Sequence, residues 1–239
     1  MKSLVCSAFF LLAFSQTVQA PTAVPVKDEP HHHLVLENSY VRVFRVSIPA
    51  NDATLLHQHD LPYTFVSLGP ADFTNAVAGK PEIEAKLADG QLGYSRGNFA
   101  HIARTDHGLP FNNVTIELLH PQGDPRNGCA KVVAADPAGD CPAASAGPFV
   151  PQAQFDTAEI QGQIITMGPK SKDTELATKH ALLYVGLGKS EIQIQSKGKP
   201  AKKLSEGEVY WADDDSEVAL SNPSGEPAKL FAVVFKSRR

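Results

Sequence analysis

The chain has 239 residues, of which 42% are hydrophobic and 20% charged, a composition typical of a folded globular protein rather than a disordered or fibrous one. Its 22 basic and 26 acidic side chains give a formal net charge of −4. There is no basic tract, which argues against nucleic acid as a partner because phosphate binding needs clustered Lys and Arg.

The first twenty residues have the pattern of a secretory signal peptide. Lys2 provides a positive start, residues 4–14 form an apolar run, and Val18-Gln19-Ala20 fits a small-residue cleavage site. The run is too short to cross a bilayer, and no other apolar run approaches eighteen residues. We therefore expect a secreted or periplasmic protein with no membrane segment after processing. Residues 21–30 are expected to form a flexible N-terminal arm.

Residues 31–120 show the periodicity of β-strands. Residues 40–46 and 113–119 alternate between apolar and polar side chains, and the 18 prolines and 17 glycines of the chain leave little room for long helices. The run His31-His32-His33 has no spaced partner, so solvated surface is the expected role for it.

His57 and His59 are different, because they are two residues apart in a strand-like context. This spacing puts both imidazoles on the same face of a strand. If that face is the interior, burial of two adjacent imidazoles needs a reason, and a divalent cation supplies one.

Residues 121–150 form the least regular part of the chain. Five prolines and four glycines in thirty residues are twice the density of the whole sequence, which is typical of a connector between domains. The connector contains Cys129 and Cys141, the two cysteines that remain once the signal peptide is removed. An even pair in an exported chain predicts a disulfide.

Residues 151–239 repeat features of the first half. The segment from Gly79-Lys80-Pro81 to Gly90 is echoed by the segment from Gly198-Lys199-Pro200 to Gly207. Upstream, Gly69 and Gly188 end similar apolar runs. The offsets are 119 residues at Gly69 and 117 at Gly90, and near-constant offsets at separate anchors predict a duplication of one β-domain.

A third histidine, His101, follows the glycine-rich turn of residues 90–97. Residues 55–69 and 90–101 resemble the two motifs of the cupin superfamily, the first an HxH pair followed by Glu and Gly, the second a glycine turn followed by His. The resemblance implies an all-β bicupin, with two double-stranded β-helix (jelly-roll) barrels in tandem at residues 31–120 and 151–239. It also implies that His57, His59 and His101 bind one divalent transition metal, of Fe, Mn, Ni, Cu or Zn.

The sequence departs from the family pattern where the family places its glutamate ligand, because Tyr63-Thr64 stands there. Three neutral imidazoles leave the double charge of the metal uncompensated, which favours an anionic ligand. Glu117 is a further candidate carboxylate, although a strand glutamate more often faces solvent.

In the second half the offsets map the three histidines onto Leu176, Thr178 and Val218. These side chains cannot replace imidazoles as ligands, so the second barrel is expected to lack the metal and to serve as a structural or docking partner.

The resemblance implies that a small molecule enters the barrel mouth and meets the ion among Tyr63, Phe65 and Phe99. A dioxygenase acting on a small anionic or phenolic substrate fits such a site, and Arg96 and Asn98 are candidates for orienting an anion. Two alternatives stay open: a non-catalytic module that binds a small molecule or carbohydrate, and a Lewis-acid isomerase or lyase. A homodimer formed through edge strands also fits the resemblance.

Overall fold

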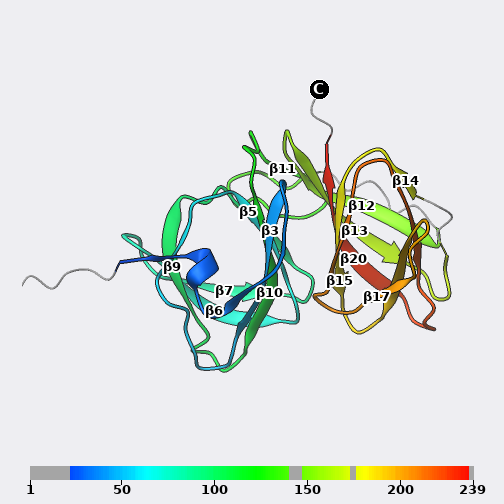
Figure 1. Ribbon diagram of the computed structural model, residues 1–239. Coiled ribbons are helices and arrows are strands. Elements are labelled where there is room, and N and C mark those ends of the chain that lie inside the picture. Colours follow the sequence, from blue (N-terminus) through cyan, green and yellow to red (C-terminus); the bar gives the residue numbers. More distant parts are fainter. Residues whose placement is uncertain (1–21, 140–146, 173–175, 237–239) are drawn as a thin grey trace, which may run out of the picture.

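The computed structural model describes residues 22–139, 147–172 and 176–236. Over these residues the chain forms β-strands and one short 3-10 helix, and the strands assemble into four sheets (Figure 1). None of the described segments is a helix long and apolar enough to cross a membrane. The predicted all-β class is confirmed.

Two of the sheets form the first sandwich, with strand orders β1-β4-β9-β6-β7 and β2-β3-β10-β5-β8. The first sheet contains β1 (Val24–Pro25), β4 (His57–His59), β9 (Phe99–Arg104), β6 (Ala71–Val77) and β7 (Ile83–Leu87). The second contains β2 (His32–Glu37), β3 (Val41–Ile48), β10 (Phe111–Leu118), β5 (Tyr63–Ser67) and β8 (Leu92–Ser95). The 3-10 helix η1 (Val26–Asp28) lies between β1 and β2.

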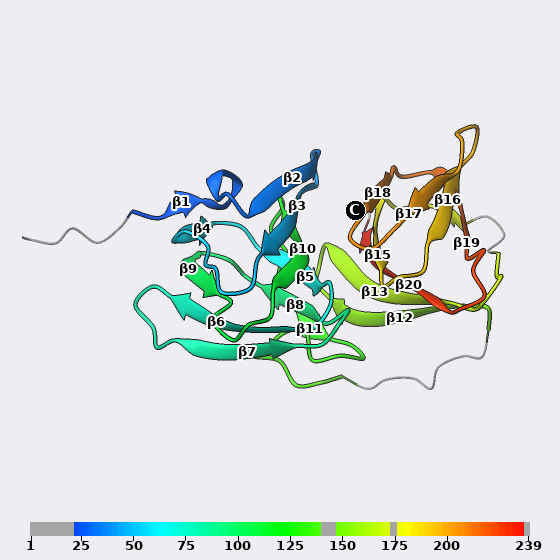
Figure 2. The same ribbon diagram turned by 90° about the horizontal axis from the view of Figure 1, so that it is seen from below.

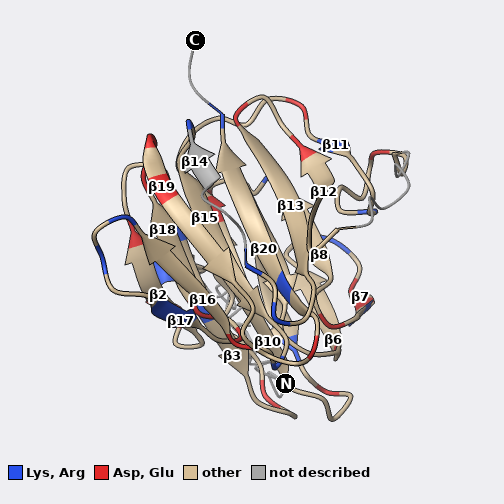
Figure 3. Ribbon diagram, turned by 90° about the vertical axis from the view of Figure 1, so that its right-hand side faces the viewer, with Lys and Arg blue, Asp and Glu red and all other residues tan. Residues whose placement is uncertain are grey.

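The other two sheets form the second sandwich, with strand orders β11-β12-β13-β20-β15-β18 and β14-β19-β16-β17. The larger sheet contains β11 (Arg126–Asn127), β12 (Phe149–Asp156), β13 (Ile160–Met167), β20 (Ala228–Phe235), β15 (Leu182–Leu187) and β18 (Val209–Ala212). The smaller contains β14 (Leu176–Thr178), β19 (Ser216–Ser221), β16 (Ile192–Ser196) and β17 (Lys202–Leu204). Basic and acidic residues are interspersed over the side of the molecule in Figure 3, mainly in loops and at strand edges.

The two sandwiches share most of their strand arrangement: β4-β9-β6-β7 corresponds to β14-β19-β16-β17, and β2-β3-β10-β5-β8 corresponds to β12-β13-β20-β15-β18, whereas β1 and β11 have no counterpart. His57 pairs with His101 across β4 and β9, and Leu176 pairs with Val218 across β14 and β19. The first members of these pairs are 119 residues apart and the second members 117 apart. The corresponding strands are thus related by the offsets that the sequence anchors predicted.

The anchor glycines have a conformational reason for being glycine. Gly69 and Gly188 have φ angles of 86° and 68°, and Gly90 and Gly207 have φ angles of 71° and 72°. These left-handed values are unfavourable for residues with a Cβ atom, so each half keeps a glycine at the same two turns.

Each sandwich has its own apolar core, and a third cluster joins the two sandwiches, which lie side by side (Figure 2). We call this third group the joining cluster. Its fully or largely buried members are Val41, Val43, Val66, Leu68, Leu92, Val114, Ile116, Leu118 and Val132 from one side, and Phe155, Ile160, Ala181, Leu183, Val185, Leu187, Phe231, Val233 and Phe235 from the other. The outer faces of two sheets therefore form one continuous apolar layer.

Strand β10 shows how this layer shapes the first sandwich. Val114, Ile116 and Leu118 belong to the joining cluster, whereas Asn113 and Thr115 line a cavity inside the first sandwich. The predicted alternation is present, but its apolar face looks outward, because the second sandwich covers it. The polar face is left to line the interior.

Residues 24–29 are ordered against the first sandwich, so the prediction of a flexible arm over residues 21–30 is wrong for this part. Val24 pairs with His57 in a parallel register. Val26 is 4% exposed and Glu29 is 1% exposed. A segment that buries an apolar side chain and a carboxylate is held by its packing.

The Pro/Gly-rich connector also packs onto the molecule where it is described. Val132 belongs to the joining cluster, and its carbonyl accepts a hydrogen bond of 3.1 Å from the Tyr94 N–H. The Cys129 N–H donates to the Ala153 carbonyl at 3.0 Å. Cys141 and the expected signal peptide, residues 1–20, lie outside the described residues, so the Cys129–Cys141 disulfide and the leader stay predictions.

Candidate metal centre

The histidines predicted as ligands meet on one sheet of the first sandwich. β4 and β9 are antiparallel, with His57 directly opposite His101 and His59 opposite Phe99. Because side chains alternate along a strand, His57, His59 and His101 share one face. Their ring centroids are 5.0 Å apart for His57 and His59, 4.4 Å for His57 and His101, and 5.3 Å for His59 and His101.

The turn between β8 and β9 fixes the register of these strands. Gly97 has a φ angle of 70°, and a Cβ atom there would lie 2.1 Å from the Leu61 carbonyl oxygen. Asn98 has a φ angle of 62°, and its N–H donates to the His59 carbonyl. The turn that resembles the second cupin motif thus lies directly against the end of β4, and Asn98 acts through its backbone there.

Two of the imidazoles are oriented by hydrogen bonds on one ring nitrogen. The Nδ1–H of His57 donates to the Leu55 carbonyl at 2.9 Å, and the Nδ1–H of His101 donates to Asn75 Oδ1 at 2.7 Å. Each ring therefore has its lone pair on Nε2. This is the arrangement by which proteins orient a metal-binding histidine.

Three buried nitrogen atoms at the site have no hydrogen-bond partner among the described residues: His57 Nε2, His59 Nδ1 and His101 Nε2. A buried polar atom without a partner costs about 1–3 kcal/mol, so three together in one place need an explanation. Imidazole nitrogen is the commonest protein ligand of divalent transition metals. The donor set and its unpartnered atoms therefore fit a metal ion.

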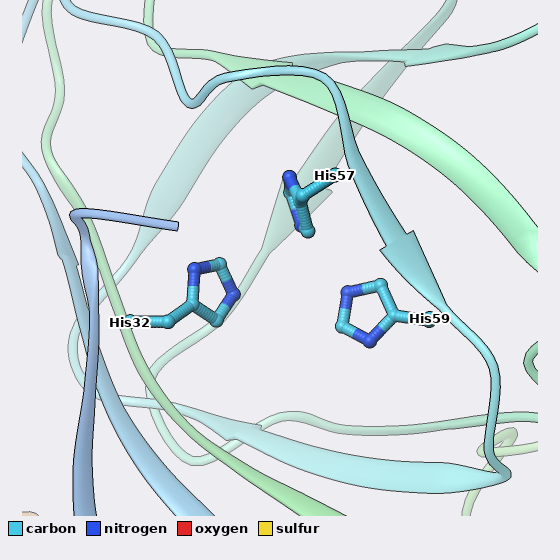
Figure 4. A group of neighbouring side chains, drawn as sticks. All are labelled: His32, His57 and His59. Atoms are coloured by element: carbon cyan, nitrogen blue, oxygen red, sulfur yellow. The ribbon is translucent and has the colours of Figure 1, made fainter. Parts of the chain in front are cut away.

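A fourth imidazole reaches the site from the opposite sheet. His32 on β2 has its ring centroid 4.8 Å from that of His57 and 6.1 Å from that of His59. Ligand atoms of His32, His57 and His59 lie within 4.8 Å of one another, and Figure 4 shows the three rings around one space. The expectation that the run at residues 31–33 is solvated surface is wrong for His32, whose side chain is 6% exposed. His33 is exposed.

His57, His59 and His101 are electrically neutral at neutral pH. Burial lowers the pKa of His57 to about 4, of His59 to about 2 and of His101 to about 3, and neighbouring histidines lower the three values further. Only a neutral imidazole offers a lone pair to a metal. The protein thus maintains the binding form of these side chains.

Tyr63 occupies the position of the family glutamate and forms a wall of the site. Its ring stacks on His59 with centroids 4.4 Å apart and an interplanar angle of 26°. Burial raises the pKa of the phenol to about 12, against the opposing effect of a hydrogen bond with Ser95. Tyr63 is therefore a protonated, largely apolar surface at neutral pH.

A cavity of about 220 Å³ adjoins the histidines inside the first sandwich. Tyr63 and Phe65 line it, as the resemblance implied, while Phe99 lies beside the site with its ring 5.2 Å from that of His101. Arg96 is on the surface, where its guanidinium pairs with Asp124 at 3.0 Å. The described residues that line the cavity are His32, Val46, Ile48, Thr54, His57, His59, Tyr63, Phe65, Phe73, Asn75, Ala85, Leu87, His101, Ala103, Phe111, Asn113 and Thr115, with no Lys, Arg, Asp or Glu among them.

Glu117 neither faces solvent nor lines the cavity. It is 2% exposed, and one of its oxygens lies 3.2 Å from an Arg42 nitrogen. Burial raises the pKa of the carboxyl group, and the nearby guanidinium opposes this shift. Glu117 is therefore neither a solvated strand residue nor a metal ligand. Its buried carboxylate forms an ion pair with the Arg42 guanidinium.

The second sandwich has no histidine at any of the equivalent positions. Leu176, Thr178 and Val218 take the places of His57, His59 and His101 by strand register. His32 pairs with Val46, and the corresponding pair in the second sandwich is Pro151 with Ile165.

Sequence comparison gives no relative: no protein-family model matches the chain, and no curated protein matches it. Solved structures do match. AerE from Microcystis aeruginosa has a TM-score of 0.62 at 11% identity, covering 87% of this chain and 99% of its own. The salicylate 1,2-dioxygenase from Pseudaminobacter salicylatoxidans has a TM-score of 0.58 at 10% identity, covering 82% and 71%.

A cupin 2 conserved barrel domain protein from Leptotrichia buccalis has a TM-score of 0.51 at 10% identity, covering 90% of this chain and 92% of its own. A tryptophan-to-tyrosine mutant of the salicylate dioxygenase has also been solved in complex with gentisate, and this structure has a TM-score of 0.60 at 10% identity. At these identities the similarity concerns the fold. The chain has the cupin fold, with two jelly-roll barrels in tandem.

Proposed function

We propose that the first sandwich, the first of the two jelly-roll barrels, binds one divalent transition metal ion through His57, His59 and His101. The adjoining cavity takes a small organic ligand. The observation that carries this proposal is the convergence of three buried imidazole nitrogens without hydrogen-bond partners. When bound, the ion supplies a Lewis-acidic centre with positions open to a ligand or to oxygen. The protein holds the imidazoles neutral and oriented beside the cavity.

The lining of the cavity supports a phenolic rather than a carboxylate substrate. A cavity of about 150 Å³ accommodates a benzene molecule, so about 220 Å³ suits one substituted ring. No described cationic side chain lines the cavity, and the amide and hydroxyl groups of Thr54, Asn75, Asn113 and Thr115 are neutral. A free carboxylate away from the metal would be buried without a counter-charge. A phenol can place its one ionisable oxygen at the metal and its ring against Phe65.

Oxygen chemistry on such a ring, as a dioxygenase, is the activity that we favour. Isomerase and lyase chemistry needs a positioned general base. Among the described residues that line the cavity, the titratable groups are the four histidines and Tyr63, whose pKa is raised to about 12 by burial. The three proposed ligands cannot act as bases while they hold the ion, and His32 lies close enough to His57 and His59 to bind the same ion, so it is not a free base either. A non-catalytic module that binds the same small molecule is the remaining alternative.

The test begins with elemental analysis of the exported protein purified without added metal. We expect about one equivalent of a transition metal, and its loss in His57→Ala and His101→Ala. Oxygen uptake is then measured with gentisate, salicylate, catechol and benzoate as probes. Uptake that is greatest with catechol, weaker with the hydroxybenzoates gentisate and salicylate, and absent with benzoate supports the dioxygenase, and ring binding without uptake supports the binding module. Metal-free protein with unchanged melting in both variants contradicts the site.

Ala85→Phe separates the cavity from the metal. Ala85 lines the cavity from β7, and a phenyl ring there fills space without replacing a histidine. We expect this variant to keep its metal and to lose binding of the phenolic probes. Loss of both would show that the cavity and the metal centre cannot be separated in this way.

Export to the periplasm or the extracellular space is also part of the proposal. It rests on the leader pattern at residues 1–20 and the even cysteine pair of the remaining chain. N-terminal sequencing of the protein recovered outside the cytoplasm would give the cleavage position, and size-exclusion chromatography of the same sample would test the predicted homodimer.

A further inference from the structure

We propose that His32 is a fourth ligand of the metal and that Glu29 is the residue that positions it. This inference rests on the metal site proposed above and extends it to the N-terminal segment of the described chain. In the resulting arrangement, three imidazoles come from one sheet and the fourth comes from the sheet facing it.

The position of His32 supports a ligand role. His57 and His59 lie on β4 of one sheet, and His32 lies on β2 of the other. A ligand nitrogen of His32 lies within 4.8 Å of those of both β4 histidines, and Figure 4 shows its ring turned toward theirs. Two nitrogens bound to one ion at about 2.0–2.1 Å each lie no more than about 4.2 Å apart. The ligand nitrogens of His32, His57 and His59 therefore need to move only slightly closer together to bind one ion.

The hydrogen bond of His32 decides which of its nitrogens is available. The Nδ1–H of His32 donates to Glu29 Oε2 at 2.6 Å. The lone pair of the ring is therefore on Nε2, as in His57 and His101. A carboxylate bonded to the far nitrogen of a metal-binding histidine orients the ring and makes it a stronger donor.

Both carboxylate oxygens of Glu29 already accept hydrogen bonds, so Glu29 is not itself a metal ligand. Oε2 also accepts from the His31 N–H at 2.9 Å, and Oε1 accepts from His31 Nδ1–H at 2.9 Å and from the Leu55 N–H at 3.2 Å. The Glu29 side chain is 0% exposed, and its two oxygens accept four N–H hydrogen bonds, which is the environment that a buried carboxylate requires. Glu29 is thus a buried anion directly behind a histidine of the site.

This arrangement replaces the carboxylate that the family pattern places at the position of Tyr63. Four neutral imidazoles leave the double charge of the ion uncompensated. A negative charge on Glu29, one imidazole away, offsets part of it through His32 rather than through a direct bond. The departure at Tyr63 and the burial of Glu29 thereby have one explanation.

The test uses the processed full-length chain, stripped of metal and titrated with Cu²⁺, as wild type, His32→Leu, Glu29→Gln and His33→Leu. His33→Leu is the matched control, because His33 is the exposed neighbour in the same run. Circular dichroism and melting without metal establish that each variant is folded. Affinity comes from calorimetry, and the number of bound nitrogens comes from the nitrogen hyperfine pattern in electron paramagnetic resonance.

We expect His32→Leu to lose one nitrogen from the hyperfine pattern and to bind Cu²⁺ at least about 10-fold more weakly. Glu29→Gln should keep the number of nitrogens but bind about 10-fold more weakly, with altered spectral parameters. Glu29→Asp, which keeps the charge, should recover part of the affinity and takes the place of Glu29→Gln if that variant does not fold. His33→Leu should match the wild type.

The outcomes separate the two proposals. Wild-type protein that binds no Cu²⁺ overturns the metal site itself. Wild-type binding with an unchanged spectrum and affinity in His32→Leu overturns the fourth ligand and leaves the other three in place. Unchanged affinity and spectrum in the Glu29 variants overturn the positioning role.

Discussion

His57 and His101 lie directly opposite each other across the β4–β9 pair, with ring centroids 4.4 Å apart. The same two positions of the second barrel hold Leu176 and Val218. The β4–β9 pair of the first barrel thus has histidines at the positions where the β14–β19 pair of the second barrel has aliphatic residues. The second barrel shows that the same strand pair forms with aliphatic residues at these two positions.

The first prediction follows from this comparison. His57→Leu introduces the residue of the second barrel, and in metal-free protein we expect the free energy of unfolding to change by less than about 1 kcal/mol. The lost hydrogen bond to Leu55 is offset by removal of a buried nitrogen without a partner. Ile116→Ala, an ordinary core truncation, should cost about 3 kcal/mol. Urea unfolding in the presence of a chelator measures both.

Metal should make the wild type clearly more stable than His57→Leu. An ion present at 100 times its Kd stabilises the folded state by about 2.7 kcal/mol. We expect this gain in the wild type and little of it in His57→Leu, measured by the same unfolding experiment with Zn²⁺ added. An equal gain in both proteins would show that the ion binds somewhere other than this site.

The third prediction concerns pH in metal-free protein. Burial lowers the pKa values of His57, His59 and His101 to about 4, 2 and 3, below the ordinary 6.5. Below about pH 6.5 the unfolded chain therefore binds more protons than the folded one, and stability falls as the pH falls toward 4. Each histidine contributes up to about 1.4 kcal/mol per pH unit.

Two other groups modify this trend. Glu29, with its pKa lowered to about 2, adds a further loss of stability below about pH 4.5. The pKa of His31 is raised, because its hydrogen bonds to Glu29 and Asp52 outweigh burial, so His31 acts in the opposite direction. Urea midpoints between pH 8 and 5 measure the net effect, and His57→Leu should show a shallower slope. A flat profile would contradict buried neutral imidazoles.

The fourth prediction concerns the buried ion pair of Glu117 and Arg42. Arg42→Met leaves a carboxylate that is 2% exposed without its partner, and we expect a loss of about 2 kcal/mol at pH 8 because the arginine itself is partly exposed. The loss should shrink as the pH falls, since Glu117, whose pKa is raised by burial, then takes up a proton. Adding Glu117→Gln to Arg42→Met should recover part of it. Additive losses would contradict the pairing.

The fifth prediction concerns the cysteines. Peptide mapping without reductant should recover Cys129 and Cys141 in one disulfide-linked fragment. Closing a thirteen-residue loop stabilises the fold by about 3 kcal/mol in the chain-entropy description. Cys141→Ser should therefore lower the free energy of unfolding by an amount of this order, as reduction of the wild type should also do. Two free thiols in the purified protein would contradict the pairing.

Much of the fold can be read from local patterns in the sequence. Period-two alternation finds the strands, and the glycine turns at Gly69 and Gly188 reveal the duplication, because a left-handed backbone conformation restricts the residue type locally. His57, His59 and His101 are predictable for the same reason: strand spacing places two of them on one face, and a turn motif precedes the third.

The remaining features depend on which surfaces meet in space. His32 lies in a run of three histidines, and its inward direction follows from the pairing of β2 with β3, which contains an irregularity between Leu34 and Leu36. Glu29 can hydrogen-bond to His32 because it directly follows η1, which packs against β2 and β4. Ile116 and Leu118 on β10 face the second barrel. Because side chains alternate along a strand, Glu117 points to the opposite face, into the first barrel. None of these packing relationships has a local pattern in the sequence.

The joining cluster has a consequence for how such a protein can change. A barrel that lost its ligands, as the second one lacks them at Leu176 and Val218, has lost only polar groups that were costly to bury. Losing its outer face would instead expose Val114, Ile116 and Leu118 of its neighbour to water. The polar groups inside one barrel can therefore be replaced during evolution, while its outer face must stay apolar because the other barrel packs against it.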